Sequence, residues 1–594
     1  MVIWPSWFWG PKFRSPRASP SPSAIHSFPC TRLVQLTPVS VVALPLKDGV
    51  LAVKTPSRLG VPYSRVLAKY DHEHTSFRPH HQTPQDMRTK VEEWLIRHAK
   101  CGEEKPECRE CVRSGHKCDG YTNASQKELQ HQMNDAASRI WNSGPGGNSV
   151  LMPGTRQERQ YVHLFCTHAT KALSGFFTSE FWTRFLPQLS QREPTIRHAV
   201  VAVGVMYEQQ LQGRLLPTSP QEDVSDAFVL QQYNRAIKNL LHQISAPQES
   251  AVDLTLIACL LFACVEMLRQ NNVRTMDHVQ AGLQILRRRL QNGRNDAITR
   301  LDRELVHIFR RLNLQIAFFG RPLVTMNIAT EKSTLLPPGQ KLTFENIDQA
   351  RECLTSTLNR GMILIQQVGF ERVIPPAKVY MQRLEQQNAF LDELDTWHTA
   401  FKALRHKSAK GAGISDPRAP LILLVQYHAA LIWVTNCLVR EETAYDAFFT
   451  NFEVLVTSAE ELVRLSRAAQ LSSVEEGFTL DAELIPPLYW TAFRCRHPLL
   501  RRRAIQVIID YPSKEGMWGK RLNICAAQTV MEFEEAPYSF LPVEDRLPQE
   551  HHRIYEALLS PEKEFYENPC LMLFMLKPHG VDAEWVNHQT EVHW

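Results

Sequence analysis

Four cysteines lie within 18 residues of one another, at a spacing that suits a metal site. They are Cys101, Cys108, Cys111 and Cys118, in the pattern C-x6-C-x2-C-x6-C. Two thiolates separated by two residues can bind one tetrahedral zinc ion from a single turn, and cysteines six residues away can complete its coordination. Four unrelated thiols are the plainer interpretation, but this density of cysteines favours a zinc site.

Basic side chains alternate with these cysteines along the segment. A nearby positive charge lowers the pKa of a thiol and so favours the thiolate that binds zinc. The same charges can contact the phosphates of DNA. The basic residues concerned are Lys105, Arg109, Arg113 and Lys117.

Residues 96–121 resemble the last two-thirds of the fungal binuclear zinc cluster. That family holds two zinc ions with six cysteines in the pattern C-x2-C-x6-C-x(5–12)-C-x2-C-x(6–8)-C. The shared features are basic residues before the third cysteine, a Lys-Pro loop and a Ser-Gly pair before the last cysteine. The resemblance implies that Cys101, Cys108, Cys111 and Cys118 are ligands three to six, with Cys108 bridging the two metals.

The resemblance also implies how the module reads DNA. In the family, the helix between ligands two and three enters the major groove at a CGG triplet. The matching positions here are Arg97 and His98, with Lys100 in support. Basic side chains that read the O6 and N7 atoms of guanine are the expected chemistry. The implied partners are double-stranded DNA with CGG-type half-sites and the transcription machinery, in the nucleus; a homodimer is left open.

The chain departs from the family at the first two ligands. The spacing places them at positions 91 and 94, where this sequence has Val91 and Trp94. At most one four-cysteine zinc ion could then be held. The local charge is also weak, since residues 88–121 carry eight Lys or Arg against seven Asp or Glu, and Glu92 and Glu93 would repel phosphate.

Two explanations for this departure stay open. The DNA-binding module has decayed, or the coding sequence was assembled wrongly and the exon for the first two cysteines was lost or an intron was kept. The resemblance stops abruptly between Lys90 and Val91. Every valine codon begins with GT, the usual start of an intron, which favours the second explanation.

The composition of the whole chain is that of an ordinary soluble protein. It is 43% hydrophobic and 22% charged, with a formal charge of +5 over 594 residues, too small to indicate nucleic acid by itself. The other nine cysteines are scattered, and several of them, such as Cys259 and Cys264, lie in apolar runs, which suits buried thiols in a reducing compartment. The apolar run at 254–265 has the length of a core helix rather than of a membrane span, so we expect no membrane partner.

The chain divides into four predicted segments. Residues 1–88 are rich in proline and serine and are predicted to be disordered. Residues 89–121 hold the truncated zinc module, and 122–155 form a polar linker that ends in glycines and prolines. From 156 to 594, apolar residues recur at three- and four-residue spacing, which predicts a large all-helical domain of stacked helices. The predicted fold class is therefore mostly α.

Parts of this helical region resemble the fungal-specific regulatory domain that follows such clusters. The resemblance is carried by residues 174–208, by the runs LIACLLFACVEMLR and HVQAGLQIL, and by 486–508. It implies a helical domain that carries regulation or activation. A pocket between its helices for a small effector is compatible with this architecture, but the sequence assigns no residue to one.

Three further features of the helical region have a structural interpretation. Five arginines form a basic strip that we interpret as a solvated helix face rather than a second DNA contact. His198 and His278 lie beside apolar residues and are expected to be structural. An aromatic group is interpreted as core rather than as a ligand box. The strip comprises Arg494, Arg496, Arg501, Arg502 and Arg503, and the aromatic group comprises Phe176, Phe177, Phe181, Trp182 and Phe185.

These sequence features bear on three function classes. The first is a sequence-specific regulator of RNA polymerase II genes, and family members often control a neighbouring metabolic gene cluster. The second is a regulatory or interaction protein with a decayed zinc cluster that does not bind DNA directly. The third is an enzyme, against which the absence of the motifs G-x-S-x-G, G-x-x-x-x-G-K-[ST], H-E-x-x-H and G-x-G-x-x-G argues.

Overall fold

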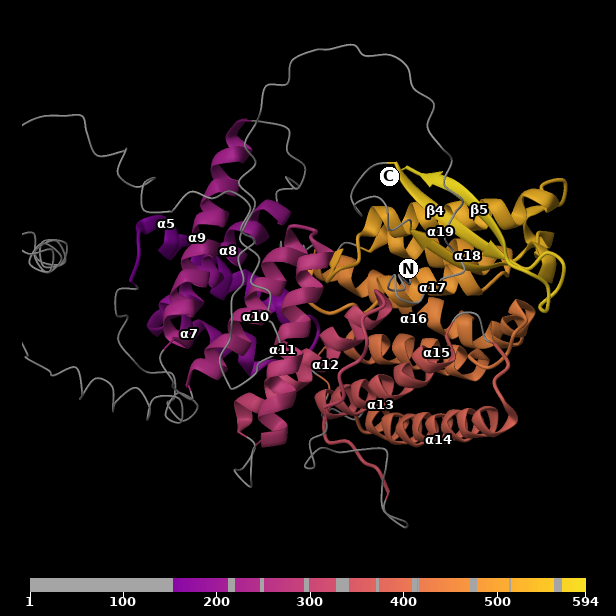
Figure 1. Ribbon diagram of the computed structural model, residues 1–594, viewed down its shortest axis with the longest axis horizontal. Coiled ribbons are helices and arrows are strands. Elements are labelled where there is room, and N and C mark those ends of the chain that lie inside the picture. The colour runs from indigo at the N-terminus through magenta and orange to yellow at the C-terminus, as the bar shows by residue number, and fades with distance from the viewer. Residues whose placement is uncertain are drawn as a thin grey trace, which may run out of the picture. The chain divides into compact units, whose positions relative to one another are not determined.

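The protein is described by a computed structural model (Figure 1). The structure describes residues 153–211, 220–245, 250–292, 299–326, 341–369, 373–408, 414, 416–470, 478–511, 514–559 and 569–593. The segments predicted at 1–88 and 89–121, and nearly all of the predicted linker, lie outside these residues.

The first group of helices runs from α5 to α11. Its members are α5 (Arg156–Leu164), η5 (Phe165–Ala169), α6 (Thr170–Ser174), η6 (Phe181–Phe185), α7 (Leu186–Arg192), α8 (Pro194–Leu211), α9 (Pro220–Ile244), α10 (Ser250–Leu268) and α11 (Asn272–Asn292). The helices α8 and α10 are its centre: α8 packs on α5, α7, α9 and α10, and α10 also packs on α11. Both are apolar nearly all round, as fully buried helices are.

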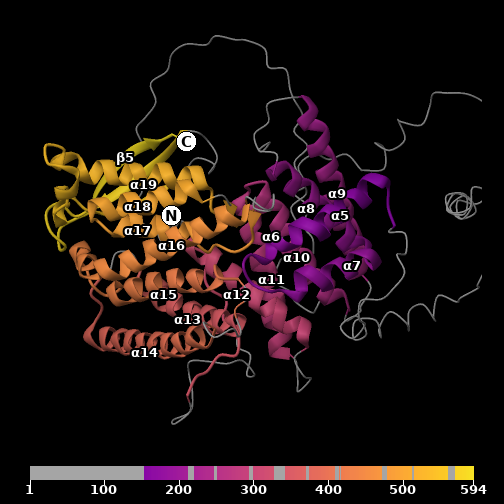
Figure 2. The same cartoon turned by 180° about the vertical axis from the view of Figure 1, so that it is seen from behind.

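The second group runs from α13 to the last described strand, and α12 joins the two groups by packing on both α11 and α13 (Figures 1 and 2). The joining helix is α12 (Arg300–Phe318). The helices of the second group are α13 (Ile347–Val368), α14 (Ala377–Ser408), α15 (Ala419–Asn436), η7 (Glu442–Phe448), α16 (Phe449–Gln470), α17 (Ile485–Arg494), α18 (Pro498–Asp510), α19 (Lys520–Glu535), η8 (Ala536–Tyr538), η9 (Val543–Asp545) and η10 (Glu550–His552).

Helix starts are held in two ways, by a capping residue next to the helix and by a side chain from a distant part of the chain. Thr299 caps α12, accepting a hydrogen bond from the Asp302 backbone while the Asp302 side chain accepts from the backbone of Thr299. This reciprocal capping box satisfies two backbone donors that have no partner inside the helix. The start of α17 is held from outside, because the Glu515 carboxylate accepts backbone N–H groups from Leu484 and Ile485.

Two small sheets complete the second group. In the first, β1 (Phe478–Thr479) pairs in parallel with β2 (Lys514–Glu515). In the second, β3 (Ile554–Leu559), β4 (Cys570–Leu576) and β5 (Val586–Val592) form an antiparallel sheet with β4 in the middle. Phe574 of β4 packs on Phe533 of α19 with ring centroids 5.2 Å apart, so the sheet covers that helix.

The predicted fold class is confirmed, because the described chain is mostly α-helical after its first 155 residues. The three C-terminal strands are the part that the sequence pattern did not predict. Their central strand reads CLMLFML, and a short run rich in leucine and methionine does not distinguish a buried strand from a helix.

Two described helices are long and apolar enough to cross a membrane by composition alone. They are Ala251–Leu268 in α10 and Ala419–Asn436 in α15, and 83% and 61% of these windows are buried inside the protein. Core helices pass the same test, and the packing of both helices against several neighbours is that of core helices.

Candidate functional site

The residues predicted to hold zinc or to read DNA lie outside the described part of the chain. They are Arg97, His98, Lys100, Cys101, Cys108, Cys111 and Cys118. Among the residues that the structure does describe, no group of three or more His, Cys, Asp or Glu side chains could hold a metal ion, and the cysteines there are free thiols. The zinc site therefore stays a prediction.

The basic strip differs from its prediction as a solvated helix face. Arg494, Arg496 and Arg501 are 5%, 0% and 0% exposed. Arg502 and Arg503, in contrast, are partly exposed and pair with Glu535 and Glu460. The sequence could not distinguish these cases, because the carboxylates that pair with the buried arginines lie far away along the chain.

The buried arginines belong to an ion network that joins five elements. Arg494 donates to Glu442 at 2.8 Å and to Glu556 at 2.7 Å. Arg496 pairs with the same Glu442 at 2.8 Å and with Glu534 at 3.1 Å. Arg501 pairs with the second oxygen of Glu534 at 2.9 Å. The network thus ties α17 and α18 to η7, α19 and β3, and its role is structural.

Two other interpretations of the sequence are confirmed. His278 is half-buried and its Nε2 lies 2.8 Å from the hydroxyl of Tyr233, and Nδ1 of His198 lies 2.6 Å from Oε1 of Gln232. Burial lowers the pKa of His278 to about 4. In the aromatic group, all but the half-buried Phe176 are core side chains.

The strongest candidate for a ligand site in the described chain is a cavity of about 180 Å³ in the second group of helices. Four helices contribute one face each, namely α12, α13, α15 and α17. Single residues of α14 and η7, residues 481–482, β3 and Trp518 complete the wall. On α12 the lining residues are Arg311, Leu314, Gln315 and Phe318, which lie on one face at helical spacing. Two alanines of α15, Ala429 and Ala430, leave the space that larger side chains would fill.

Much of the cavity wall is aromatic. Phe318 stacks on Trp433 with ring centroids 5.6 Å apart and planes at 21°. Trp433 stacks in turn on Trp490 at 5.7 Å and 30°. Trp518 meets Phe318 edge-on at 6.0 Å. Each ring comes from a different segment, so the wall exists only in the folded chain.

The charged groups that line the cavity are paired with one another. Asp481 accepts from Arg351 at 2.5 Å and from Arg311 at 3.1 Å. Arg494 and Glu556 form the second pair. Burial opposes the charged form of Arg311, but Asp481 and neighbouring carboxylates outweigh it and raise its pKa. Three arginines and two carboxylates line the wall, and two carboxylates behind it, Glu483 and Glu442, complete the pairing of the arginines.

Three buried polar atoms on residues that line the cavity have no hydrogen-bond partner within the described residues. They are Nε1 of Trp518, Oε1 of Gln315 and Nε of Arg494. Trp518 is 2% and Gln315 is 3% exposed, and buried polar groups are normally satisfied. The sequence offered no signal for these residues, because an amphipathic helix face and scattered tryptophans look the same in a solid core.

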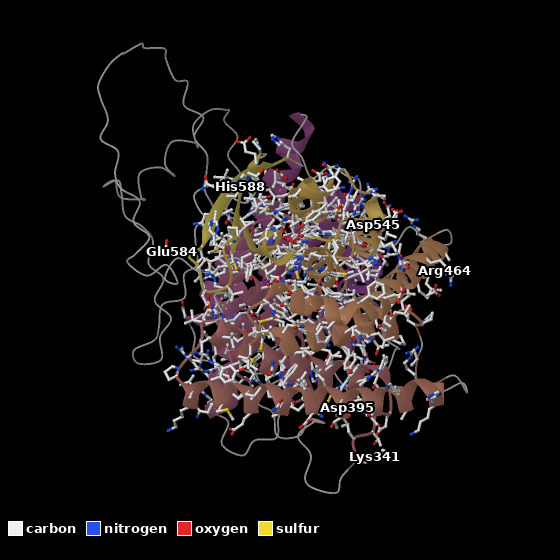
Figure 3. All side chains as sticks on the ribbon, turned by 90° about the vertical axis from the view of Figure 1, so that its right-hand side faces the viewer. Lys341, Asp395, Arg464, Asp545, Glu584 and His588 are labelled. Atoms are coloured by element: carbon white, nitrogen blue, oxygen red, sulfur yellow. The ribbon has the colours of Figure 1, made fainter. Side chains whose placement is uncertain are left out.

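The charged side chains labelled in Figure 3 are exposed to solvent, unlike the charged side chains that line the cavity. Arg464 and Asp545 are exposed, and Arg464 pairs with Glu461 on its own helix at 2.7 Å (Figure 3). Exposed pairs of this kind contribute little to stability.

Comparison with known proteins matches two protein families in order along the chain. Residues 96–128 match the family described as "Fungal Zn(2)-Cys(6) binuclear cluster domain", and residues 160–390 match the one described as "Fungal specific transcription factor domain". The predicted resemblance is therefore confirmed: the chain is similar to both domains of the fungal zinc-cluster transcription factors, in the expected order. The first match begins at residue 96, after the positions of Val91 and Trp94.

Two similar proteins carry names that fit this class. One is the "Aspercryptin biosynthesis cluster-specific transcription regulator atnN" of Emericella nidulans, 24% identical over 407 residues, with 64% of each chain covered. The other is the "Transcription regulator lscL" of Purpureocillium lilacinum, 25% identical over 204 residues, 32% of this chain and 47% of that protein. The chain thus spans less than two thirds of the length of either relative. No solved structure matches the chain.

Proposed function

We propose that the protein is a sequence-specific DNA-binding regulator of transcription by RNA polymerase II, acting in the nucleus. The observation that carries the proposal is the order of the two matches, a zinc-cluster domain at 96–128 followed by a fungal-specific transcription factor domain at 160–390. The class of both relatives supports it, since each is named as a transcription regulator.

Zinc fits the donor set of the N-terminal module. Cys101, Cys108, Cys111 and Cys118 supply four thiolates, which is the full complement of one tetrahedral structural site. When bound, zinc supplies folding free energy to a segment too short to bury a core of its own. With Val91 and Trp94 in place of cysteines, the module holds at most one ion.

Arg97 and His98 read the base edges of a CGG-type half-site, and Lys100 supports them. Each good bidentate contact with a base contributes about 1–3 kcal/mol of discrimination. Binding as a homodimer would place two such modules on two half-sites. The helical domain that follows carries the regulatory function.

The target genes belong to a secondary-metabolite cluster. The support is the printed name of the first relative, a cluster-specific regulator of aspercryptin biosynthesis. Transcript levels of the genes that flank this one, measured in a deletion strain, test the assignment. Unchanged levels of every neighbouring biosynthetic gene would contradict it.

Gel shifts on CGG-containing duplexes test DNA binding by the full chain. Binding is expected for the full chain and lost in the double variant Cys108→Ala/Cys111→Ala. The matched control is Cys166→Ala/Cys525→Ala, which removes two partly buried thiols of the helical domain. Binding that survives the first double variant would show that the zinc cluster is not the DNA reader.

Lys100→Ala tests the groove assignment. It is expected to weaken binding by about 1–3 kcal/mol and to relax base preference. Lys341→Ala, an exposed lysine of the helical domain, serves as the control. Unchanged affinity and base preference in Lys100→Ala would rule the assignment out.

The second function is a regulatory protein with a decayed zinc cluster. It is favoured by Val91 and Trp94 and by the net local charge of only +1, from eight basic and seven acidic residues between 88 and 121. Zinc analysis per chain separates the cases, with one ion expected for a surviving site and none for a decayed one. A transcript that encodes two further cysteines would restore the six-cysteine cluster and two ions.

A further inference from the structure

The cavity bounded by α12, α13, α15 and α17 has the features of a ligand site rather than of a packing defect. A hydrophobic core is close-packed, so an apolar hollow that reaches into it from the surface is a place where a ligand can bind. The cavity measures about 180 Å³. An apolar cavity of roughly 150 Å³ is large enough to bind benzene, so this one has room for a single substituted aromatic ring.

The wall indicates a flat ligand. Phe318, Trp433 and Trp490 form a continuous stack along it, with ring planes 21° and 30° apart. Aromatic faces bind another ring in offset-stacked or edge-on geometry. Aliphatic residues of α13, including Leu358 and Ile365, cover other parts of the wall.

An unpartnered atom indicates a polar group on that ligand. Trp518 lines the cavity and offers an indole N–H that has no hydrogen-bond partner within the described chain. Burial of such a group without a partner is costly. A ligand with one hydrogen-bond acceptor would satisfy it, and a phenolic hydroxyl supplies one.

The charges indicate a neutral ligand. Arg311 and Arg351 are already held by Asp481, and Arg494 by Glu442 and Glu556. A charged ligand would have to leave water without gaining a free counter-charge. We propose that this cavity binds a small neutral aromatic molecule of the phenol class, whose hydroxyl accepts a hydrogen bond from the indole N–H of Trp518.

Calorimetric titration of the full chain with phenol and with toluene tests the proposal, because the two probes differ in the polar group and not in size class. Both are expected to bind. Trp518→Phe removes the N–H and keeps a ring, so it should weaken phenol about five- to tenfold, the effect of one hydrogen bond, and leave toluene unchanged. Trp397→Phe is the matched control, since the Trp397 indole donates to the carbonyl of Ala350 away from the cavity.

The second part of the experiment uses variants that fill the cavity. Ala430→Leu, or the smaller Ala429→Val if the first unfolds as judged by circular dichroism, should reduce the affinity for both probes at least tenfold because their space is taken. Failure of either probe to bind the wild-type chain would overturn the proposal. Binding that neither Trp518→Phe nor the filled variants alter would also overturn it, because the site would then lie elsewhere.

A cavity that holds only water gives a different result. Water would occupy the polar end and neither probe would displace it, so the titrations would show no heat, and the assignment to an aromatic ligand would be wrong. None of these outcomes depends on zinc or DNA, so the test stands apart from that of the proposed function.

Discussion

The arginines of the basic strip show how one residue type takes two roles within a few positions. Arg496 is fully buried between Glu442 and Glu534, whereas Arg503 lies at the surface with Glu460. Removal of one member of a buried pair leaves its partner charged and without water, while an exposed pair is replaced by solvent.

We expect Arg496→Met to lower the free energy of unfolding by about 3–5 kcal/mol, because two carboxylates then lose a buried partner. Arg503→Met is expected to cost at most about 1 kcal/mol. Urea unfolding of both variants checks the difference. Equal midpoints for the two variants would show that the network is not a stabilising feature.

Burial of His278 predicts a dependence of stability on pH. Burial, helped by Arg274, lowers its pKa from 6.5 to about 4 in the folded chain. The unfolded chain therefore binds the proton first as the pH falls, and the contribution of His278, complete above pH 6.5, is lost as the pH falls towards 4. Between pH 6.5 and 5 this loss amounts to about 2 kcal/mol.

The measurement is the melting temperature of the full chain between pH 5 and 7.5. His278→Gln keeps a partner for Tyr233 without a titrating group, so its melting temperature should fall less steeply with acid. The exposed His579→Gln is the control and should keep the wild-type slope. A wild-type slope in His278→Gln would show that other groups control the acid response.

At the scale of elements, close helix contacts depend on glycine. A Cβ atom at Gly282 of α11 would lie 2.4 Å from the ring of Phe309 on α12, which is far inside contact distance. The same applies to Gly361 of α13, where the ring of Phe390 on α14 would be 2.2 Å away. These positions let α11 and α12, and α13 and α14, approach closely.

Gly282→Ala is therefore expected to destabilise the chain by about 1–3 kcal/mol through overpacking, although alanine favours a helix. Gly519→Ala is the control, because a Cβ there meets nothing within 4 Å, and its cost should stay within about 1 kcal/mol. Thermal unfolding followed by circular dichroism compares them. A stabilised Gly282→Ala variant would mean that the two helices can separate freely.

How far the sequence predicts these elements depends on their length. Long amphipathic helices such as α11 and α12 are visible in the spacing of their apolar residues, and the basic end of α11 and the cap at Thr299 mark their limits. The strand β4 is too short and too uniformly apolar to be distinguished from a helix. Its partner strands lie up to 22 residues away in register, from Cys570 to Val592, and no local pattern encodes that pairing.

At the scale of the whole molecule, the two candidate sites differ in how they can be found. The residues of the predicted zinc module are close together along the chain, so the spacing of Cys101 to Cys118 predicts the module directly. The cavity is assembled from α12, α13, α15 and α17, and each segment alone reads as an ordinary core helix. A sequence therefore offers a site prediction only where the residues that carry the chemistry are close together along the chain.

Chelation separates the two parts of the chain. A zinc chelator is expected to abolish binding to CGG-containing DNA and to leave the helical unfolding transition unchanged, since no candidate metal group occurs in the described helical region. Gel shifts and circular dichroism on the same sample check this. A helical transition that moves to lower temperature on chelation would show that the metal supports the helical region too.

The ion network at Glu534 and Arg494 also has a consequence for synthesis on the ribosome. Arg494 reaches its partner Glu556 only after 62 further residues have been made, and β3 needs β4 before it has a neighbour. While Glu556 is still in the exit tunnel, Arg494 of α17 has only Glu442 of its two carboxylate partners. A nascent chain stopped before Ile554 by a premature stop codon would keep that defect and become a substrate for quality-control proteases.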